Sequence, residues 1–394
     1  MKKFNVRLHQ IVVIIKYIFY FVYCKIKKIN NNDMWIISER GNEARDNGYS
    51  FYKFIKKEHK GINVKYIIDI NSSDAKKIKN KEDIVEYGSK EHYILFLTAG
   101  VLASTHIMGF SPEFRLFTRL DRYNLVKLHG KRIFLQHGII KDASPGLNKE
   151  NVKLDMFVCG AKREYEFLLK TLNQGPNVLK YTGLARYDYL KSKTEKNILV
   201  MPTWRMKLFY HTDKFKETSY FKAWNGLLNN ETLHQVLEKY NYKLIFYPHY
   251  EMQQYVSEFN TNSENILIAD FEKFDVSDLL CKTSMLITDY SSVFFDVAYM
   301  RKPIIYYQFD YKEFRKEHYS EGYFNYIDDG FGKVITEKKT LIHEIDKILK
   351  SGCYVEEMYE KRRNNFFEYN DKQNCRRIYE EIVKLKNNIW KLTN

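Results

Sequence analysis

The chain is poor in the residues that mark fibrous, disulfide-rich and low-complexity proteins. Its 394 residues include only 17 glycines and 6 prolines, below the usual shares of about 7% and 5%, and no repeat or low-complexity tract. The five cysteines are scattered, odd in number and never spaced as C-x-x-C, which argues against a disulfide framework or a cysteine zinc site. These absences indicate a globular protein in a reducing cytosol, and the length predicts about two domains.

Acidic residues are missing from the first thirty positions, which carry seven lysines and arginines around an apolar run at residues 11–23. Thirteen helical residues extend about 20 Å, which is short of a hydrocarbon core of about 30 Å. No small-residue cleavage site follows, so a cleaved signal peptide is disfavoured. We expect residues 1–32 to form a basic helix on an anionic membrane surface; the alternative is a packed helix with solvated lysines.

The net charge of +15 calls for an anionic partner, a membrane surface or merely a lysine-rich composition. Nucleic acid is not expected as a partner, because no recognition motif accompanies the charge.

Short β-branched runs alternate with helical stretches from Met34 onward, which is typical of a parallel α/β architecture. A polar stretch at residues 189–196 separates two such series. We predict two α/β domains, 33–190 and 191–394, the second ending in a helical tail from about residue 354 to 390. The expected strands are 35–38, 64–69, 101–105, 132–136, 156–159, 198–201, 243–247, 266–269, 285–288 and 303–307.

Two histidines directly follow expected strands, one in each half of the chain: His137, before Gly138, and His249, after Pro248. Ligands of doubly wound sheets bind at the carboxyl ends of strands, and imidazole changes protonation near neutral pH. The pair therefore predicts a cleft between domains with a general base. The alternative for each is a hydrogen-bonded turn histidine.

Further candidate ligand groups follow strands of the second half. Thr203 can donate to an oxyanion, and Arg205 offers the planar fork that suits phosphate, unless it is a surface arginine beside a packed tryptophan. After the strand ending at Thr288 and Asp289, we expect Ser291 and Ser292 to open a helix whose amides bind phosphate; a simple serine N-cap is the alternative. Gly330 lies in a loop that suits a ligand or a plain turn equally.

Together these motifs resemble the CDP-glycerol glycerophosphotransferase family, whose members build teichoic acids and polyol-phosphate capsules. Two departures associate the chain with the capsule-type branch: Gln136 replaces a common tryptophan, and residues 139–142 lack the Thr/Ile-Pro-Leu-Lys pattern of many wall teichoic acid enzymes. The stretches that carry the resemblance are 37–49, 136–138, 182–188, 202–205, 248–249 and 288–296.

The resemblance implies a GT-B-like fold, two Rossmann-like domains facing each other across a cleft. It implies transfer of glycerol phosphate or ribitol phosphate from CDP-glycerol or CDP-ribitol to a lipid-linked glycan, with release of CMP, at the cytoplasmic face of the membrane. His137 matches the family's base and His249 a second essential histidine. Arg205, Thr288, Ser291 and Ser292 match donor-binding positions, and we add Thr203, Asp289 and Gly330 as neighbours of that site.

No acidic cluster has metal-ligand spacing, so we expect no obligatory metal, and a Mg²⁺ ion held loosely on the donor diphosphate stays open. Two other functions also stay open: a GT-B glycosyltransferase that uses a sugar nucleotide, and a noncatalytic scaffold on the membrane surface.

Overall fold

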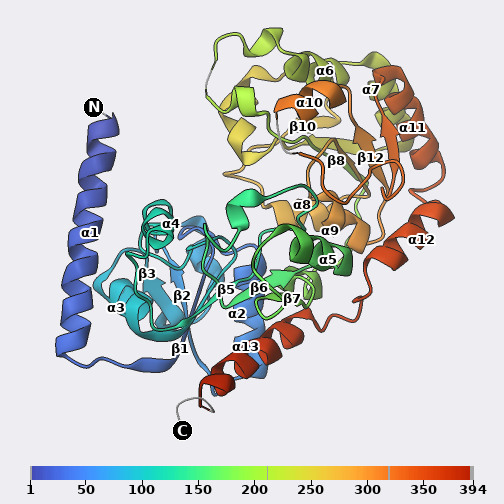
Figure 1. Ribbon diagram of the computed structural model, residues 1–394. Coiled ribbons are helices and arrows are strands. Elements are labelled where there is room, and N and C mark those ends of the chain that lie inside the picture. Colours follow the sequence, from blue (N-terminus) through green and yellow to red (C-terminus); the bar gives the residue numbers. More distant parts are fainter. Residues whose placement is uncertain (1, 211, 318–319, 391–394) are drawn as a thin grey trace. The chain divides into compact units, whose positions relative to one another are not determined.

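The computed structural model describes residues 2–210, 212–317 and 320–390 (Figure 1). It divides the chain into two compact units. Unit 1 comprises Met1–Ile139, Ser144–Tyr189 and Asp371–Asn394, and unit 2 comprises Ile140–Ala143 and Leu190–Asn370.

Unit 1 is built on a parallel sheet whose seven described strands have the order β3-β2-β1-β4-β5-β6-β7. The order reverses between β1 and β4, which is where a doubly wound sheet binds ligands. Near-continuous apolar strands such as β4 are fully buried, as parallel strands covered on both faces require. The strands are β1 (Asn31–Ser38), β2 (Asn63–Ile68), β3 (Ile84–Glu86), β4 (Ala99–Ser104), β5 (Lys131–Phe134), β6 (Met156–Cys159) and β7 (Leu179–Tyr181).

Unit 2 repeats the plan with six described parallel strands in the order β10-β9-β8-β11-β12-β13. Its core gathers around Trp224, which is fully buried. The order reverses between β8 and β11, so the carboxyl ends of these two strands are the expected ligand position. The strands are β8 (Asn197–Met201), β9 (Lys243–Phe246), β10 (Ile266–Ile268), β11 (Met285–Thr288), β12 (Ile304–Tyr307) and β13 (Lys333–Ile335).

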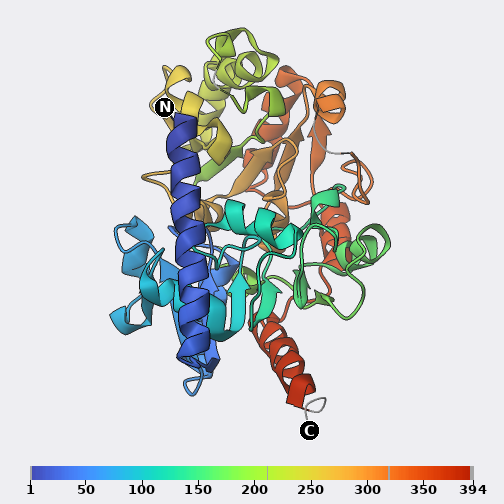
Figure 2. The same ribbon diagram turned by 60° about the vertical axis from the view of Figure 1, so that its left-hand side comes forward.

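Helices cover the sheets of both units (Figures 1 and 2). Several begin with a side-chain cap that accepts a hydrogen bond from the first turn, including Ser89, Thr218, Asn230 and Asp275. The α-helices after the first are α2 (Asn47–Glu58), α3 (Lys90–Thr98), α4 (Phe114–Arg122), α5 (Lys162–Thr171), α6 (Ser219–Leu228), α7 (Glu231–Tyr240), α8 (Val276–Lys282), α9 (Phe294–Tyr299), α10 (Tyr311–Glu317), α11 (Lys338–Lys350), α12 (Glu357–Phe366) and α13 (Asn374–Trp390).

The α/β expectation is confirmed, and each of the ten expected strands is present within a few residues. The strands that the sequence did not reveal are β3, β7 and β13, each three residues long and each at an edge of its sheet. Three residues are too few to show a hydrophobic period.

The first helix, α1 (Lys2–Ile26), is longer than the apolar run suggested, with 25 residues. Its 18-residue window His9–Ile26 has a mean hydropathy of 1.4 and is long and apolar enough to cross a membrane, so the expectation that this segment is too short to span was wrong on length. Helix α1 packs along α3 through buried Val13, Tyr17 and Cys24. A core helix passes the same length and composition test, although only 17% of this window is buried.

The C-terminal helix α13 packs on unit 1, whereas we had expected the tail to stay with the second domain. The Asp188 carboxylate accepts hydrogen bonds from the backbone N–H groups of Asn374 and Cys375 at 3.0 and 2.8 Å. The ring of Tyr379 lies 5.9 Å from that of Trp35 on β1. These contacts fix the helix to the first sheet.

Candidate active site

His137 lies in the loop that follows β5, in unit 1. The chain turns there through Gln136, a buried residue with φ of 66°, a left-handed conformation that costs about 1–2 kcal/mol outside glycine. Two contacts hold this turn. The Gln136 side chain donates to Glu164 at 2.6 Å, and its carbonyl accepts a hydrogen bond from the Asn47 side chain at 2.7 Å.

The imidazole of His137 is oriented by a carboxylate. Asp46 Oδ2 lies 2.8 Å from His137 Nδ1, and Asp46 Oδ1 accepts from Arg186 Nη1 at 2.7 Å. The same Arg186 nitrogen donates to the His137 carbonyl at 2.6 Å. Burial opposes the charge of Asp46, but Arg186 and His137 outweigh it and hold its pKa below the usual value. Asp46 is therefore an ionised partner that fixes one ring nitrogen of an exposed histidine.

The loop between β1 and α2 is organised around Glu39, which is fully buried. Its carboxylate accepts hydrogen bonds from the backbone N–H groups of Arg45, Asp46 and Tyr49 at 2.8–2.9 Å. Burial and the nearby Asp46 charge raise the pKa of Glu39. Glu39 thus shapes the backbone that presents Asp46.

A second histidine of unit 1 accompanies the first. The rings of His106 and His137 are 4.9 Å apart, and His106 Nε2 lies 4.0 Å from a Glu43 carboxylate oxygen. Burial, and then the neighbouring His137 and Arg40, lower the pKa of His106. A neutral imidazole therefore sits beside the candidate base.

In unit 2, His249 is the N-cap residue of the 3-10 helix η7 (Tyr250–Glu258), just beyond β9. Its Nδ1 accepts from the Glu251 backbone N–H at 3.2 Å, and its ring lies 6.4 Å from that of Trp204. With Nδ1 as an acceptor, a neutral His249 carries its proton on Nε2, as a donor to an anion requires.

Arg205 is a buried structural ion rather than an open phosphate ligand in this structure. Its guanidinium donates to Asp310 at 2.8 and 3.1 Å, to Asp289 at 2.8 Å and to the carbonyls of Thr203 and Trp204 at 2.8 and 3.3 Å. Burial disfavours the charge, but the two carboxylates outweigh it and raise the pKa of Arg205. The network ties the loops after β8, β11 and β12 together.

The other predicted donor-site residues take different positions in unit 2. The Thr288 hydroxyl donates to the Met201 carbonyl at 2.6 Å. The Asp289 carboxylate also accepts from the backbone N–H of Thr203 at 2.7 Å. The Thr203 hydroxyl itself is buried without a hydrogen-bond partner.

Ser291 and Ser292 do not open a helix, because α9 begins only at Phe294. Both serines lie in the preceding turn, which closes with a hydrogen bond from the Phe295 N–H to the Ser292 carbonyl at 3.1 Å. They are half-buried. Gly330 is buried, and a Cβ there would lie 2.0 Å from the Tyr326 carbonyl oxygen, so a close approach of backbone explains this glycine.

A hollow of about 610 Å³ opens at the carboxyl ends of β9 and β10. Three aromatic side chains, Phe209, Tyr250 and Phe271, stand in its wall and are 37–51% exposed. Gln253 also lines it, with a buried Oε1 that has no hydrogen-bond partner. The remaining lining residues are Glu251, Gln254, Val256, Asp270 and Glu272.

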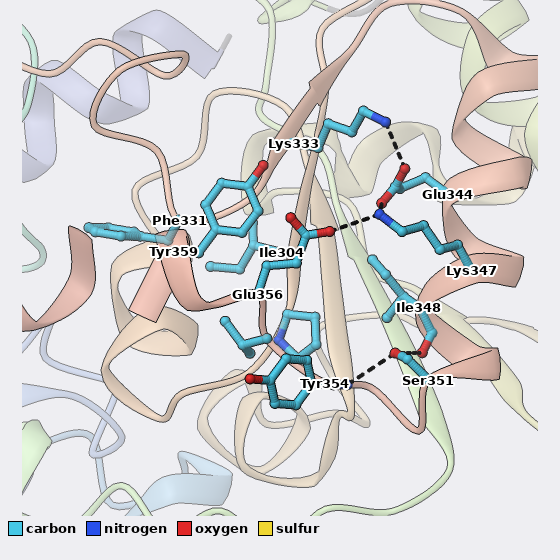
Figure 3. A pocket seen from close by; sticks show the side chains of 12 residues that line it. Ile304, Phe331, Lys333, Glu344, Lys347, Ile348, Ser351, Tyr354, Glu356 and Tyr359 are labelled. Carbon is cyan, nitrogen blue, oxygen red and sulfur yellow. Dashed lines mark hydrogen bonds and ion pairs between the residues drawn. The ribbon is translucent and has the colours of Figure 1, made fainter. Parts of the chain in front are cut away.

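A second, smaller hollow of about 160 Å³ lies at the other end of the sheet (Figure 3). It adjoins Ile304 and Lys333, the first residues of β12 and β13. Figure 3 shows Lys347 between Glu344 and Glu356, with nitrogen to oxygen distances of 3.5 and 2.8 Å. Its place at the amino ends of the strands separates it from the candidate active site.

Within residues 2–210, 212–317 and 320–390, no group of three or more histidine, cysteine, aspartate or glutamate side chains is arranged to hold a metal ion.

Comparison with known families matches residues 18–384 to the model described as CDP-Glycerol:Poly(glycerophosphate) glycerophosphotransferase. The chain belongs to this family, which confirms the resemblance seen in the sequence.

Among its relatives, the minor teichoic acid biosynthesis protein GgaB of Bacillus subtilis is 34% identical over 91% of this chain, which spans only 40% of GgaB. A teichoic acid glycerol-phosphate transferase of Staphylococcus aureus is 23% identical over 90% of the chain and 94% of its own length. The wall teichoic acid polymerase TagF has the same fold, with a TM-score of 0.69, 18% identity and 98% of both chains covered.

Asp46, Arg186, His106 and Glu39 were not among the site residues predicted from the sequence. A signal was present for three of them, because Glu39 and Asp46 lie in the stretch 37–49 and Arg186 lies in the stretch 182–188, both of which carry the family resemblance. His106 likewise follows β4, the strand beside the reversal point.

Proposed function

We propose that the chain transfers glycerol phosphate from CDP-glycerol to a hydroxyl group of a teichoic-acid-type acceptor and releases CMP. The observation that carries the proposal is the Asp46, His137 and Arg186 constellation at the carboxyl end of β5. Family membership supports it, as do a relative named for glycerol-phosphate transfer and a structure of TagF with CDPG. The chain spans 40% of GgaB, so the proposal does not extend to other activities of such longer proteins.

In the proposed reaction, His137 is the general base. Asp46 holds Nδ1, so Nε2 takes the proton of the acceptor hydroxyl as its oxygen attacks the β-phosphorus of the donor. The bond from that phosphorus to the bridging oxygen breaks, and CMP leaves with the electron pair. Asp46 stabilises the imidazolium that forms, as a paired carboxylate does.

On the donor side, we assign the larger hollow beside His249 to the nucleoside. Its aromatic side chains offer faces for a base to stack on, and its volume lies in the range of small-molecule sites. Its carboxylates disfavour phosphate there, so the diphosphate belongs nearer to His249 and the loops that Arg205 ties together. This makes Arg205 a positioning residue rather than a direct ligand.

The proposal also specifies the acceptor and the polyol. The alternative to glycerol phosphate is ribitol phosphate, the alternative to a teichoic-acid-type acceptor is a capsule-type acceptor, and the alternative to a CDP-activated donor is a sugar nucleotide. The decisive assay incubates the purified chain with CDP-glycerol, CDP-ribitol or a sugar nucleotide and a polyprenyl-linked glycan. We expect CMP with CDP-glycerol only. A nucleoside diphosphate released from a sugar nucleotide, with no CMP from either CDP donor, would overturn phosphotransfer.

We also propose that α1 attaches the protein to the membrane. Opposite its packed face, α1 exposes apolar side chains, among them Ile15 and Phe19, each 60% exposed. Burying about 25 cal/mol per Å² of such surface in lipid, with lysines near anionic headgroups, favours attachment. The double substitution Ile15→Gln and Phe19→Gln should move the protein to the soluble fraction and leave the packed face intact. Leu267→Gln, at an exposed position of β10, is the matched control, and unchanged fractionation of the double variant would contradict the proposal.

A further inference from the structure

The chain leaves unit 1 immediately after the candidate base. Ile139 belongs to unit 1, and the next four residues, Ile140–Ala143, belong to unit 2; we call these four residues the strap. Consecutive Cα atoms of an extended chain advance by at most about 3.6 Å per residue, so His137 and Lys141 lie within about 14 Å of each other whatever the placement of the units.

The strap is anchored in unit 2 by buried charges. The Lys141 ammonium pairs with the neighbouring Asp142 carboxylate, and both residues are less than 10% exposed. Arg315 Nη1 donates to the other Asp142 oxygen at 2.9 Å, and the Lys141 ammonium lies 5.5 Å from the centre of the Tyr326 ring. Buried ions that share partners resist separation, because removing one leaves the others uncompensated.

The backbone of the strap is held as well. The Ala143 N–H donates to the Ser320 carbonyl at 3.2 Å. A Cβ at Gly322 would lie 2.1 Å from the Lys141 carbonyl oxygen, so this position requires glycine for the strap to fit. Main-chain contacts therefore hold the strap on unit 2 in addition to the ion pairs, and we call this position on unit 2 the seat of the strap.

This seat adjoins the loop after β11, where the sequence placed donor-binding residues. Tyr326, which faces Lys141, donates through its hydroxyl to the Tyr290 carbonyl at 3.1 Å. Burial lowers the pKa of Lys141, while Asp142 and, more weakly, Asp289 act to raise it. The negative charge of Asp289 therefore acts on the Lys141 ammonium of the strap.

We propose that the strap is a positioning device: the contacts that hold Lys141 and Asp142 beside loop 289–290 restrain the backbone that directly follows His137. This rests on the proposed function, in which His137 acts on a donor held by unit 2. Displacing a catalytic group by about 1 Å can cost about 10²-fold in rate, whereas binding of the donor to unit 2 does not need the strap. Lys141 and Asp142 are positioning residues and touch no reacting atom.

The direct test lengthens the tether. One glycine inserted after Ile139 adds up to about 3.6 Å of chain. The matched control is one glycine inserted after Ser192, in the exposed stretch 191–196 at another crossing between the units. We expect kcat for CMP release to fall about 10²-fold in the first variant only, with the Kd for CDP-glycerol and the Tm retained in both. Equal kcat in the two variants would overturn the proposal.

A second variant covers the case in which the insertion does not fold. Asp142→Asn removes both ion pairs with little change in volume, and Lys207→Met, which breaks an exposed pair with Glu317, is its control. We expect Asp142→Asn to lower kcat without weakening donor binding, with partial rescue by Asp142→Glu. A lower Tm with unchanged kcat would mean that the pair is only structural.

Hydrogen exchange separates this proposal from the proposed function, since it needs no turnover. The amides of the strap, including that of Ala143, which donates to the Ser320 carbonyl at 3.2 Å, should exchange at least about tenfold faster in the insertion and Asp142→Asn variants than in their controls. If wild-type protein releases no CMP, the proposed function fails, while unchanged exchange at these amides overturns the strap by itself.

Discussion

The substitution Asp46→Asn tests whether the carboxylate beside His137 acts in catalysis. It keeps the size of the side chain and removes its charge, and the amide can donate to the imidazole nitrogen that the carboxylate now engages at 2.8 Å. A hydrogen bond to a charged group contributes about 1.5–3 kcal/mol, which corresponds to roughly 10- to 150-fold in rate. Because the His137 side chain is 63% exposed, we expect the lower half of that range.

The assay is kcat for CMP release from CDP-glycerol, measured for wild type, Asp46→Asn, His137→Ala and the double variant. If Asp46 acts through His137, the double variant will be no slower than His137→Ala alone. Arg186→Lys is the matched variant for the other partner of the carboxylate and should cost less, since it keeps a cation. A kcat for Asp46→Asn within twofold of wild type, or additive losses in the double variant, would refute the reasoning.

Three further predictions follow from the contacts described above. His249→Ala should lower kcat about 10²-fold, as removal of a preorganised donor does, and an unchanged kcat would exclude His249 from the reaction. Arg205→Met should reduce the free energy of unfolding by about 3–5 kcal/mol, read by urea denaturation, because it leaves two carboxylates uncompensated. His92 is buried and neutral, and burial lowers its pKa to about 4, so the unfolded chain alone takes up this proton below pH 6.5. The free energy of unfolding should therefore fall by about 3 kcal/mol between pH 6.5 and 4, and a similar fall in His92→Asn would contradict this origin.

The sequence predicted the parts of the fold that repeat along the chain. Long apolar strands can be predicted from their composition. A histidine directly after such a strand, as at His137, can be predicted as a site residue because ligands bind at the carboxyl ends of parallel strands. Edge strands such as β13 stayed hidden because three residues show no period.

What could not be predicted depends on pairing between distant residues. The neighbours of Arg205 in the sequence predict a phosphate ligand. In the structure its guanidinium is paired with Asp310, which lies 105 residues away in the chain. Asp46 and His137 are 91 residues apart, and nothing in the local pattern of either joins them. The docking of α13 on unit 1 depends likewise on Asp188, 186 residues before Asn374.

The docking of α13 on unit 1 has a consequence for biosynthesis. Unit 1 is completed by Asp371–Asn394, after the whole of Leu190–Asn370 has been made. Domains fold as units during synthesis. The second sheet can therefore fold before the last helix of unit 1 is available to pack on the first sheet. Until α13 leaves the ribosome, the faces of Trp35 and His59 that meet Tyr379 stay uncovered. The unit that carries His137 is therefore completed after the chain of the other unit has been made, and its first sheet gains its last helix only when the chain has left the ribosome.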